Sequence, residues 1–325
     1  MQRFLSTAVL ALACAAAFAQ SASDYPSKRI TVVIGYPAGG PTDVMMRALA
    51  PKLSAEWKQP IVVENRAGAN EAIAAQFVAK APPDGHTLML ATEVPLTMNP
   101  FLYSQLQYDP QKDFAPVSLL LTSPLTLVVP ANSPANNLAE FIALARSRGA
   151  SKPLAYASAG AGGVLHLPMA MFAKQNGIEM THVPYKGVAP ILTDLVTGEV
   201  AAAWVAVAGA APYVKDGRLK ALVVGAPSRV KALPQAPVFG ETQVAPVQAD
   251  FVFAMIAPAG TPGPITEKIA AAIRRTMTEP EFAEKFIDPF GYVTVGSTPA
   301  QLGQYLAKDR VLQAERIEVS GAKLD

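Results

Sequence analysis

The chain has 325 residues, with 27 Lys and Arg against 25 Asp and Glu, and a formal net charge of +2. So even a balance gives no support for binding to nucleic acid or to an anionic membrane surface. The single cysteine, Cys14, lies in a segment that we expect to be removed, which excludes disulfides, thiolate catalysis and cysteine-ligated metals from the mature chain.

The first 19 residues have the pattern of a secretory signal peptide. Arg3 supplies a positive charge, residues 4–17 form a mostly apolar run without acidic residues, and Ala17-Phe-Ala19 is a small-residue cleavage site. The run is too short for a membrane span of ~20 residues. The residues before Cys14 match a lipoprotein signal poorly, so we expect cleavage after Ala19 and export without lipidation.

The first part of the mature chain alternates strand-like and helix-like patterns. Such alternation predicts βαβ units with a mostly parallel, buried sheet. Pro51 falls inside the first helical pattern, where we expect it to kink or end the helix. The expected strands are 30–34, 61–64, 88–91 and 117–121, and the expected helices are 43–57 and 70–79.

A second series of the same kind follows a strand at 125–129. The mature chain has about 300 residues, enough for two α/β domains with separate cores. If the C-terminal helices return to the first domain, two strands must cross between the domains and form a hinge. The expected strands are 154–158, 180–183, 200–205, 219–224 and 251–256, and the expected helices are 137–147, 165–174, 188–197, 264–277 and 299–317.

Two glycine-rich turns each lead from a strand into a helix. They are IGYPAGGPTD at 34–43 and YASAGAGGVLH at 156–166. Both present backbone N–H groups and the positive end of a helix dipole, which favours an anion by ~0.3 to 1 kcal/mol before hydrogen bonds are counted. The alternative for each turn is that glycine only satisfies the backbone geometry.

Motifs for catalysis or for a phosphate cofactor are absent from these turns. No Lys-Ser or Lys-Thr follows the glycines as in a Walker loop, leucine replaces the third glycine of a dinucleotide fingerprint, and Tyr156 replaces the first glycine of a nucleophile elbow. The three histidines, His86, His166 and His182, lack metal-site spacing. We therefore expect no enzyme activity, metal or cofactor, and leave open whether His166 contacts a ligand or caps its helix.

An ordered set of short motifs resembles the Bug family, the periplasmic solute receptors associated with tripartite tricarboxylate transporters. The likeness runs from about Tyr25 to the C-terminus, and the set is more specific than any single motif. The motifs are YPSKRI (25–30), PAGG (37–40) followed by Thr42-Asp43, VVENR (62–66), PDG (83–85), DFAPVS (113–118), HVPYKG (182–187), APAGTP (257–262) and GSTPA (296–300).

This resemblance implies a periplasmic protein with the α/β fold of a type II periplasmic binding protein. Its two lobes, residues 24–122 with 248–325 and residues 123–247, would be joined by crossing hinge strands and close on an organic acid. The two glycine-rich turns would grip the ligand's carboxylate from opposite sides. The expected ligand-binding residues are Tyr36, Ala38, Gly39, Gly40, Thr42, Asp43, Glu93, Ser158, Ala159, Gly160, Gly162, Gly163, His166, Tyr185 and Val205.

Departures from the family pattern bear on the ligand. Glu93 and Glu71 stand where the family has small or glycine residues, and Val205-Ala206 replaces a frequent Asp-Asn. If the glutamates meet an amino group, a monocarboxylate, an amino acid or an aromatic acid packed on Tyr36 or Trp204 fits better than citrate, because a second carboxylate would be repelled. The alternative is that both glutamates cap helices or face solvent.

The expected partners are a small organic acid and the membrane subunits of a tripartite tricarboxylate transporter. We expect a monomer with no affinity for nucleic acid. Two alternatives remain open from the sequence: an exported enzyme acting on a small acid, and a receptor used for sensing instead of uptake.

Overall fold

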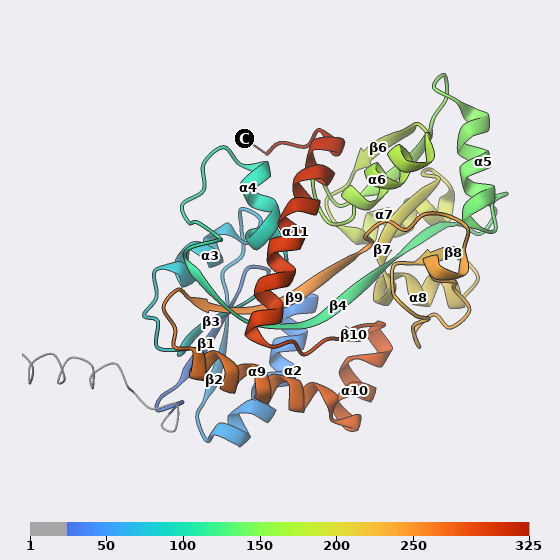
Figure 1. Cartoon of the computed structure of the whole chain (residues 1–325). Helices are drawn as coiled ribbons and strands as arrows, with labels where there is room; N and C mark the ends of the chain where they lie inside the picture. Colours follow the sequence, from blue (N-terminus) through green and yellow to red (C-terminus); the bar gives the residue numbers. More distant parts are fainter. Residues whose placement is uncertain (1–24, 325) are drawn as a thin grey trace, which may run out of the picture.

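The computed structural model describes residues 25–324, which form one mixed, curled sheet with helices on both faces (Figure 1). The expected signal peptide lies outside the described residues. The strands are β1 (Ile30–Ile34), β2 (Ile61–Asn65), β3 (Thr87–Ala91), β4 (Phe114–Pro130), β5 (Leu154–Ser158), β6 (Met180–Pro184), β7 (Ala202–Ala206), β8 (Leu219–Val224), β9 (Asp250–Pro258) and β10 (Val293–Thr294). The α-helices are α2 (Pro41–Trp57), α3 (Ala72–Ala79), α4 (Asn99–Leu102), α5 (Leu138–Arg148), α6 (Leu167–Asn176), α7 (Val188–Thr197), α8 (Val207–Lys215), α9 (Gly263–Thr278), α10 (Pro280–Phe286) and α11 (Pro299–Ser320), with short turns η1 (Val94–Met98), η2 (Phe239–Glu241) and η3 (Asp288–Phe290).

The sheet has two halves that share the long strand β4. In the first half, β1 pairs in parallel with β2 and β3, and β9 and the first part of β4 follow in antiparallel register. In the second half, β5 pairs in parallel with β6 and β7, and the last part of β4 pairs with β7 and β8 in antiparallel register. The parallel βα units are thus grouped at the two ends of the sheet.

Strand β1 is apolar at every position except Thr31, because both of its faces are covered. Val32 and Ile34 face the cluster that contains Met45, Met46 and Leu49 of α2. Val33, on the opposite face, packs in the cluster that contains Ala74 and Val78 of α3. Successive side chains of a strand alternate between the faces of the sheet, so a strand with helices on both sides is apolar at most of its positions.

The C-terminal helices return to the first half of the sheet. Ile269 and Ile273 of α9 lie in the same cluster as β1, and Leu302 of α11 lies in the cluster on the other face. Figure 1 shows α11 crossing the front of the molecule to end beside α4 and α6, and it contacts both. The chain therefore crosses between the halves once in each direction.

The crossing is formed by β4 and β9, which run side by side between the halves (Figure 1). The register joins Pro124 to Asp250 at the end of the pairing, and the Leu125 N–H donates to the Ala249 carbonyl at 2.8 Å. Gly225 lies against this point, since a Cβ there would be 2.1 Å from the Ala249 oxygen. Only glycine allows the backbones to approach so closely.

Three expectations about the elements need correction. The strands expected at 117–121 and 125–129 are parts of the continuous β4, whose register shifts next to Pro116. Helix α2 continues past Pro51, which lies on its exposed side. The sheet is mixed instead of mostly parallel, because β4 and β9 run antiparallel to their neighbours.

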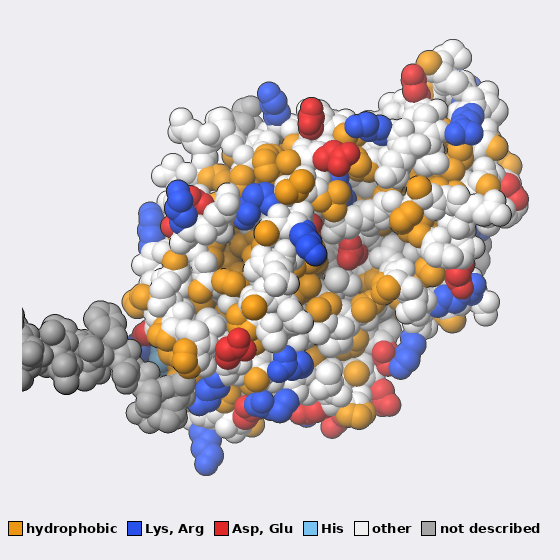
Figure 2. All heavy atoms as spheres, viewed as in Figure 1, with side chains coloured by type: hydrophobic (Ala, Val, Ile, Leu, Met, Phe, Trp, Pro, Cys, Tyr) orange, Lys and Arg blue, Asp and Glu red, His pale blue; other side chains and the backbone are white. Residues whose placement is uncertain are grey.

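Charged side chains of both signs are interspersed on the face shown in Figure 2, with no large area of one sign. This distribution agrees with the near-neutral charge balance. Among the described residues, no helix is long and apolar enough to cross a membrane.

Candidate functional site

Four helices begin at the cleft between the halves of the sheet. The parallel strands β1, β5, β6 and β7 lead into α2, α6, α7 and α8, respectively, so the carboxyl ends of these strands and the N-termini of these helices lie at the same edge. In open α/β sheets this is the edge where ligands bind. The N–H groups of each first helical turn have no partner within the helix and attract negative charge.

Two adjoining cavities occupy this cleft. The head cavity has a volume of about 260 Å³, and the aromatic compartment has a volume of about 300 Å³. They share Pro41, Val188, Ala206 and Phe251, and none of the residues that line either cavity is charged. The head cavity is lined by Tyr36, Pro41, Thr42, Thr92, Val164, Leu165, Val188, Ala206, Phe251 and Phe253.

The turn before α2 is held by Asp43. This buried carboxylate accepts hydrogen bonds from the Gly39 N–H at 2.9 Å, from Arg47 Nε at 2.9 Å and from Asn65 Nδ2 at 3.0 Å. Burial raises the pKa of Asp43, but these three donors outweigh it and leave the pKa below its ordinary value. Asp43 therefore shapes the turn, and its oxygens and the Gly39 N–H are already used within the protein.

Thr42 presents an unused donor at the N-terminus of α2. Its side chain lines the head cavity and is 2 % exposed, and its hydroxyl oxygen has no hydrogen-bond partner among the described residues. The N-cap residue, Gly40, has no side chain that could satisfy the first-turn N–H groups. Buried polar groups are nearly always hydrogen-bonded. An acceptor bound in the head cavity would satisfy this hydroxyl and the first-turn N–H groups together.

Tyr36 forms one wall of the head cavity and is supported from behind by Glu71. The Thr92 hydroxyl donates to the Glu71 carboxylate, and both side chains lie beside Tyr36, whose pKa is raised overall by burial and by the Glu71 charge. A Cβ at Gly35 would be 2.5 Å from the Glu71 side chain, so glycine at this position leaves room for it. Burial raises the pKa of Glu71 to about 7. Glu71 thus orients the wall and does not face the ligand space.

The expectation that Glu93 faces the ligand is wrong. Glu93 is 1 % exposed and lines neither cavity, and its Oε2 accepts a hydrogen bond from the Val252 N–H at 3.0 Å. Burial and the nearby Asp309 and Asp250 raise its pKa to about 8. The reason is geometric: the chain turns into η1 directly after β3, so this side chain points to the hinge strand β9 instead of the cleft.

The second glycine-rich turn is occupied by internal hydrogen bonds. The Gly162 N–H donates to His166 Nδ1 at 3.0 Å, and the Gly160 N–H donates to the Ser158 hydroxyl at 3.3 Å. Burial lowers the pKa of His166 to about 4, so its ring is a neutral acceptor at pH 7. His166 caps this turn. Gly160 and Gly162 do not offer free N–H groups, while no acceptor is present among the described residues for the N–H groups of Ala159 and Gly163.

Two further expected contacts are absent from the cleft. The Tyr185 hydroxyl donates to Asp194 Oδ2 at 2.6 Å, and Tyr185 lines neither cavity. Val205 is fully buried against α7, while its neighbour Ala206 lines both cavities because side chains alternate along β7. Trp204 is also fully buried, packed beside Phe239 behind the sheet, so it offers no surface to an aromatic acid.

Several lining residues were not expected from the sequence. In the second glycine-rich turn, Val164 and Leu165 line the head cavity and the glycines before them do not. Phe251 and Phe253 also line the head cavity. The signal for these two residues was the alternation Phe251-Val-Phe253, which puts both rings on one face of β9. Their position at the cleft depends on the crossing of β9, which periodicity does not show.

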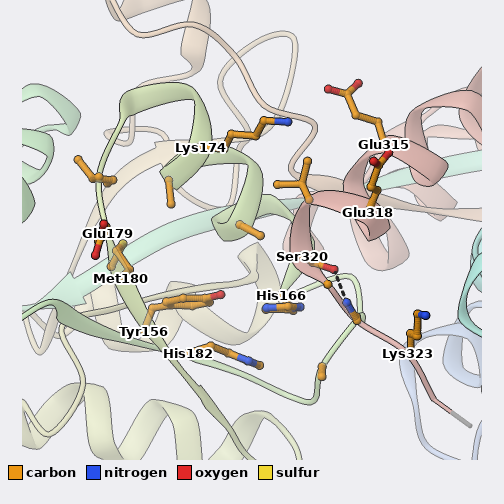
Figure 3. Close-up of a pocket in the computed structure, with 17 residues that line it drawn as sticks. Tyr156, His166, Lys174, Glu179, Met180, His182, Glu315, Glu318, Ser320 and Lys323 are labelled. Carbon is orange, nitrogen blue, oxygen red and sulfur yellow. Dashed lines mark hydrogen bonds between the residues drawn. The ribbon is translucent and has the colours of Figure 1, made fainter. Parts of the chain in front are cut away.

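A larger cavity, of about 920 Å³, lies elsewhere, between α6, β6 and the C-terminal end of α11. Figure 3 shows the rings of Tyr156, His166 and His182 stacked along one wall, with Lys323 to their right on the C-terminal segment. Its walls also carry Glu179, Glu315 and Glu318. The three carboxylates outnumber the two lysines of the lining, Lys174 and Lys323, so the cavity does not favour a carboxylate ligand, and no residue of α2 lines it.

Comparison with known proteins identifies the family. The family model described as "Tripartite tricarboxylate transporter family receptor" matches residues 45–319. The chain belongs to this receptor family. Its members are periplasmic solute-binding receptors, and a relative, the protein BugT of Bordetella pertussis, is 32% identical over 308 residues, covering 94% of this chain and 93% of that one. The resemblance to the Bug family is therefore confirmed.

Solved structures confirm the receptor fold. The structure of Rpa4515 of R. palustris with adipate has a TM-score of 0.79 at 30% identity and covers 93% of this chain and 100% of its own. MatC of Rhodopseudomonas palustris with bound malate has a TM-score of 0.73 at 30% identity, with 90% and 100% covered. Both relatives of this receptor hold a small carboxylate.

Proposed function

We propose that this receptor binds a small organic carboxylate in the periplasm and delivers it to the membrane subunits of a tripartite tricarboxylate transporter. The family membership and the carboxylates held by two structural relatives support this proposal. The pattern of residues 1–19 supports export. Receptors of this family bind solutes without converting them, so we propose that the chain is not an enzyme.

The unpaired Thr42 hydroxyl at the N-terminus of α2 is the observation on which the proposal rests. A carboxylate in the head cavity would accept this hydroxyl and the first-turn N–H groups of α2, and Tyr36 would pack against its body. Charge-assisted hydrogen bonds of this kind are about twice as strong as neutral ones. The absence of any charged side chain around the two cavities leaves the helix N-termini as the source of positive potential.

The same lining limits the number of carboxylates on the ligand. Citrate carries three, and the described lining offers no Lys, Arg or His to pair with the second and third. A monocarboxylate or an aromatic acid fits better. The amino acids considered from the sequence lose their support, since the Glu71 and Glu93 carboxylates are engaged inside the protein.

We further propose that the two halves of the sheet act as closing lobes. Their boundaries would be 24–122 with 248–325, and 123–247, with the Pro124–Asp250 crossing as the hinge. The loop N–H groups expected to grip the carboxylate are Ala38 and Thr42 in one lobe and Ala159 and Gly163 in the other. A ligand touching both lobes shifts the population towards the closed state by its preference for that state.

Isothermal titration calorimetry of the mature protein tests this function. We expect hexanoate and benzoate to bind and citrate to bind at least tenfold more weakly, with malate and adipate as reference ligands of the relatives. Mass spectrometry of the same mixtures should return every ligand intact. Failure of all carboxylates to bind would contradict the receptor proposal, and a converted product would favour the exported enzyme.

A further inference from the structure

The aromatic compartment extends the ligand space away from the carboxylate site. Its far end is formed by three aromatic side chains of one segment: Phe286 in α10, Phe290 in η3 and Tyr292 just before β10. All three side chains are half-buried, so each keeps ring surface that the protein itself does not cover. This segment belongs to the first half of the sheet.

The rings continue into the head cavity as an unbroken series. Phe290 stacks on Tyr292 with centroids 5.4 Å apart, Tyr292 meets Phe253 at 5.7 Å, and Phe253 meets Phe251 at 5.8 Å. Phe251 lines both cavities and Phe253 lines the head cavity. An apolar chain leaving the head cavity therefore meets aromatic surface along its whole path.

The lining of the aromatic compartment contains no charged residue that could pair with a second charge on the ligand. Ser123 and Tyr292 carry the polar side-chain atoms of its lining, and the other lining residues, which include Met45, Val44 and three phenylalanines, are apolar or glycine. Moving a carboxylate from water into such surroundings without a partner is costly. Burying methylene groups there is favourable, by about 0.8 kcal/mol for each.

We propose that the aromatic compartment receives the apolar end of the ligand, so that the receptor selects monocarboxylates with an alkyl or aryl tail over dicarboxylates of equal length. The inference rests on the proposed function, because it takes the carboxylate at Thr42 as its starting point. The aromatic compartment then discriminates between ligands by the length of the tail, and the N-terminus of α2 binds the charged carboxylate.

The competing occupant is a second carboxylate held by the first turn of α8. Ala208 and Gly209 line the compartment, and their N–H groups lie at the start of that helix. Adipate and hexanoate distinguish the two occupants, since both have six carbons and differ in whether the far end is charged. A dicarboxylate preference would assign the compartment to the second carboxylate and overturn the proposal.

The experiment is calorimetry with butanoate, hexanoate, octanoate and adipate. We expect affinity to rise about fourfold for each added methylene, the equivalent of ~0.8 kcal/mol, until the compartment is filled. Hexanoate should bind at least tenfold more tightly than adipate. Affinity that is independent of chain length, or tighter binding of adipate, would overturn the proposal.

A variant that fills the compartment gives the second test. Gly209 has an ordinary helical backbone, and a Cβ placed there meets no heavy atom within 4 Å, so Gly209→Leu has room to extend into the compartment. The matched control is Gly240→Leu, at an exposed glycine that also has open space and lies outside both cavities. We expect Gly209→Leu to remove the gain from butanoate to octanoate, and Gly240→Leu to keep it.

The outcomes separate this inference from the proposed function. Binding of butanoate by both variants, together with a chain-length gain that only Gly209→Leu loses, supports both proposals. Carboxylate binding with an identical chain-length gain in Gly209→Leu overturns the tail compartment and leaves the receptor function standing. Failure of the wild-type protein to bind any acid of the series, adipate included, overturns both.

Discussion

Replacing Thr42 with valine removes one hydroxyl and keeps the shape of the side chain. The hydroxyl is buried, lines the head cavity and has no partner among the described residues. In the ligand-free protein the substitution removes an unsatisfied buried group, whose desolvation costs about 1–3 kcal/mol. Thr42→Val should therefore unfold at equal or higher urea concentration than the wild type.

The same change should weaken ligand binding. A hydrogen bond to a charged group contributes about 1.5–3 kcal/mol, which corresponds to a ~10- to 150-fold increase in Kd. Calorimetry with hexanoate measures this increase, and urea denaturation without ligand measures the free energy of unfolding. Thr193→Val, on the exposed side of α7, is the control for the substitution itself.

Opposite signs in the two assays are the signature of a donor reserved for a ligand. A threefold or smaller change in Kd for Thr42→Val would refute the placement of the carboxylate at the N-terminus of α2. A loss of unfolding free energy equal to the loss of binding energy would show that the hydroxyl serves the fold. In either case, a residue other than Thr42 would have to bind the ligand's carboxylate in the cleft.

Three further changes test the turn, the hinge and the buried acid. The folded-state pKa of Glu93 is about 8, against an ordinary value of 4.5. The free energy of unfolding of the wild type should therefore fall as the pH rises from about 5 to 8, by up to ~1.4 kcal/mol per pH unit. Urea titrations at each pH should show a smaller slope for Glu93→Gln. Gly225→Ala should lower the free energy of unfolding by about 1–3 kcal/mol or more, because the new methyl group overlaps the carbonyl across the hinge, whereas Gly240→Ala in open space should not. Asp43→Asn should lower the free energy of unfolding by about 1–2 kcal/mol at pH 7, because the hydrogen bonds from Gly39 and the other donors become weaker. Since the folded-state pKa of Asp43 is lowered, this difference between wild type and mutant should vanish in denaturation measurements as the pH falls below that pKa. Three results would contradict these assignments: equal wild-type and mutant pH profiles for Glu93, equal effects of the two glycine changes, or an Asp43→Asn difference that does not shrink as the pH is lowered.

Local patterns predicted most βα units because each is specified within its own segment. Ile30–Ile34 and Leu154–Ser158 are mostly apolar on both faces, and glycine-rich turns connect them to the helices that follow. Helix α8 was not predicted, since Gly209 and Pro212 interrupt its pattern and its first residue follows β7 without a turn. Its stability comes from packing of Val207, Ala210 and Ala211, which a sequence pattern does not reveal.

The site could be predicted to the level of its turns and no further. The position of the N-terminus of α2 was predicted from the glycines, the proline and the strand that precedes them. The direction of each side chain, however, depends on the strand register and on strands that are distant in the sequence. Val205 and Ala206 exchange roles through one step of alternation along β7. Glu93 points to a backbone N–H of β9, a residue 159 positions away, and no local rule contains that partner.

The C-terminal end of α11 has a practical consequence for measuring this receptor. Ile317 and Ala322 pack with Leu167 of the second half, and the Leu324 N–H donates to the Leu102 carbonyl at 3.0 Å. A Cβ at Gly162, in the second glycine-rich turn, would lie 3.0 Å from Ala322. An affinity tag or fluorescent protein fused at this end would lie against the contact that joins the two halves of the sheet. If the halves close as proposed, a reporter or immobilisation handle placed ahead of Tyr25 would leave this C-terminal contact unchanged.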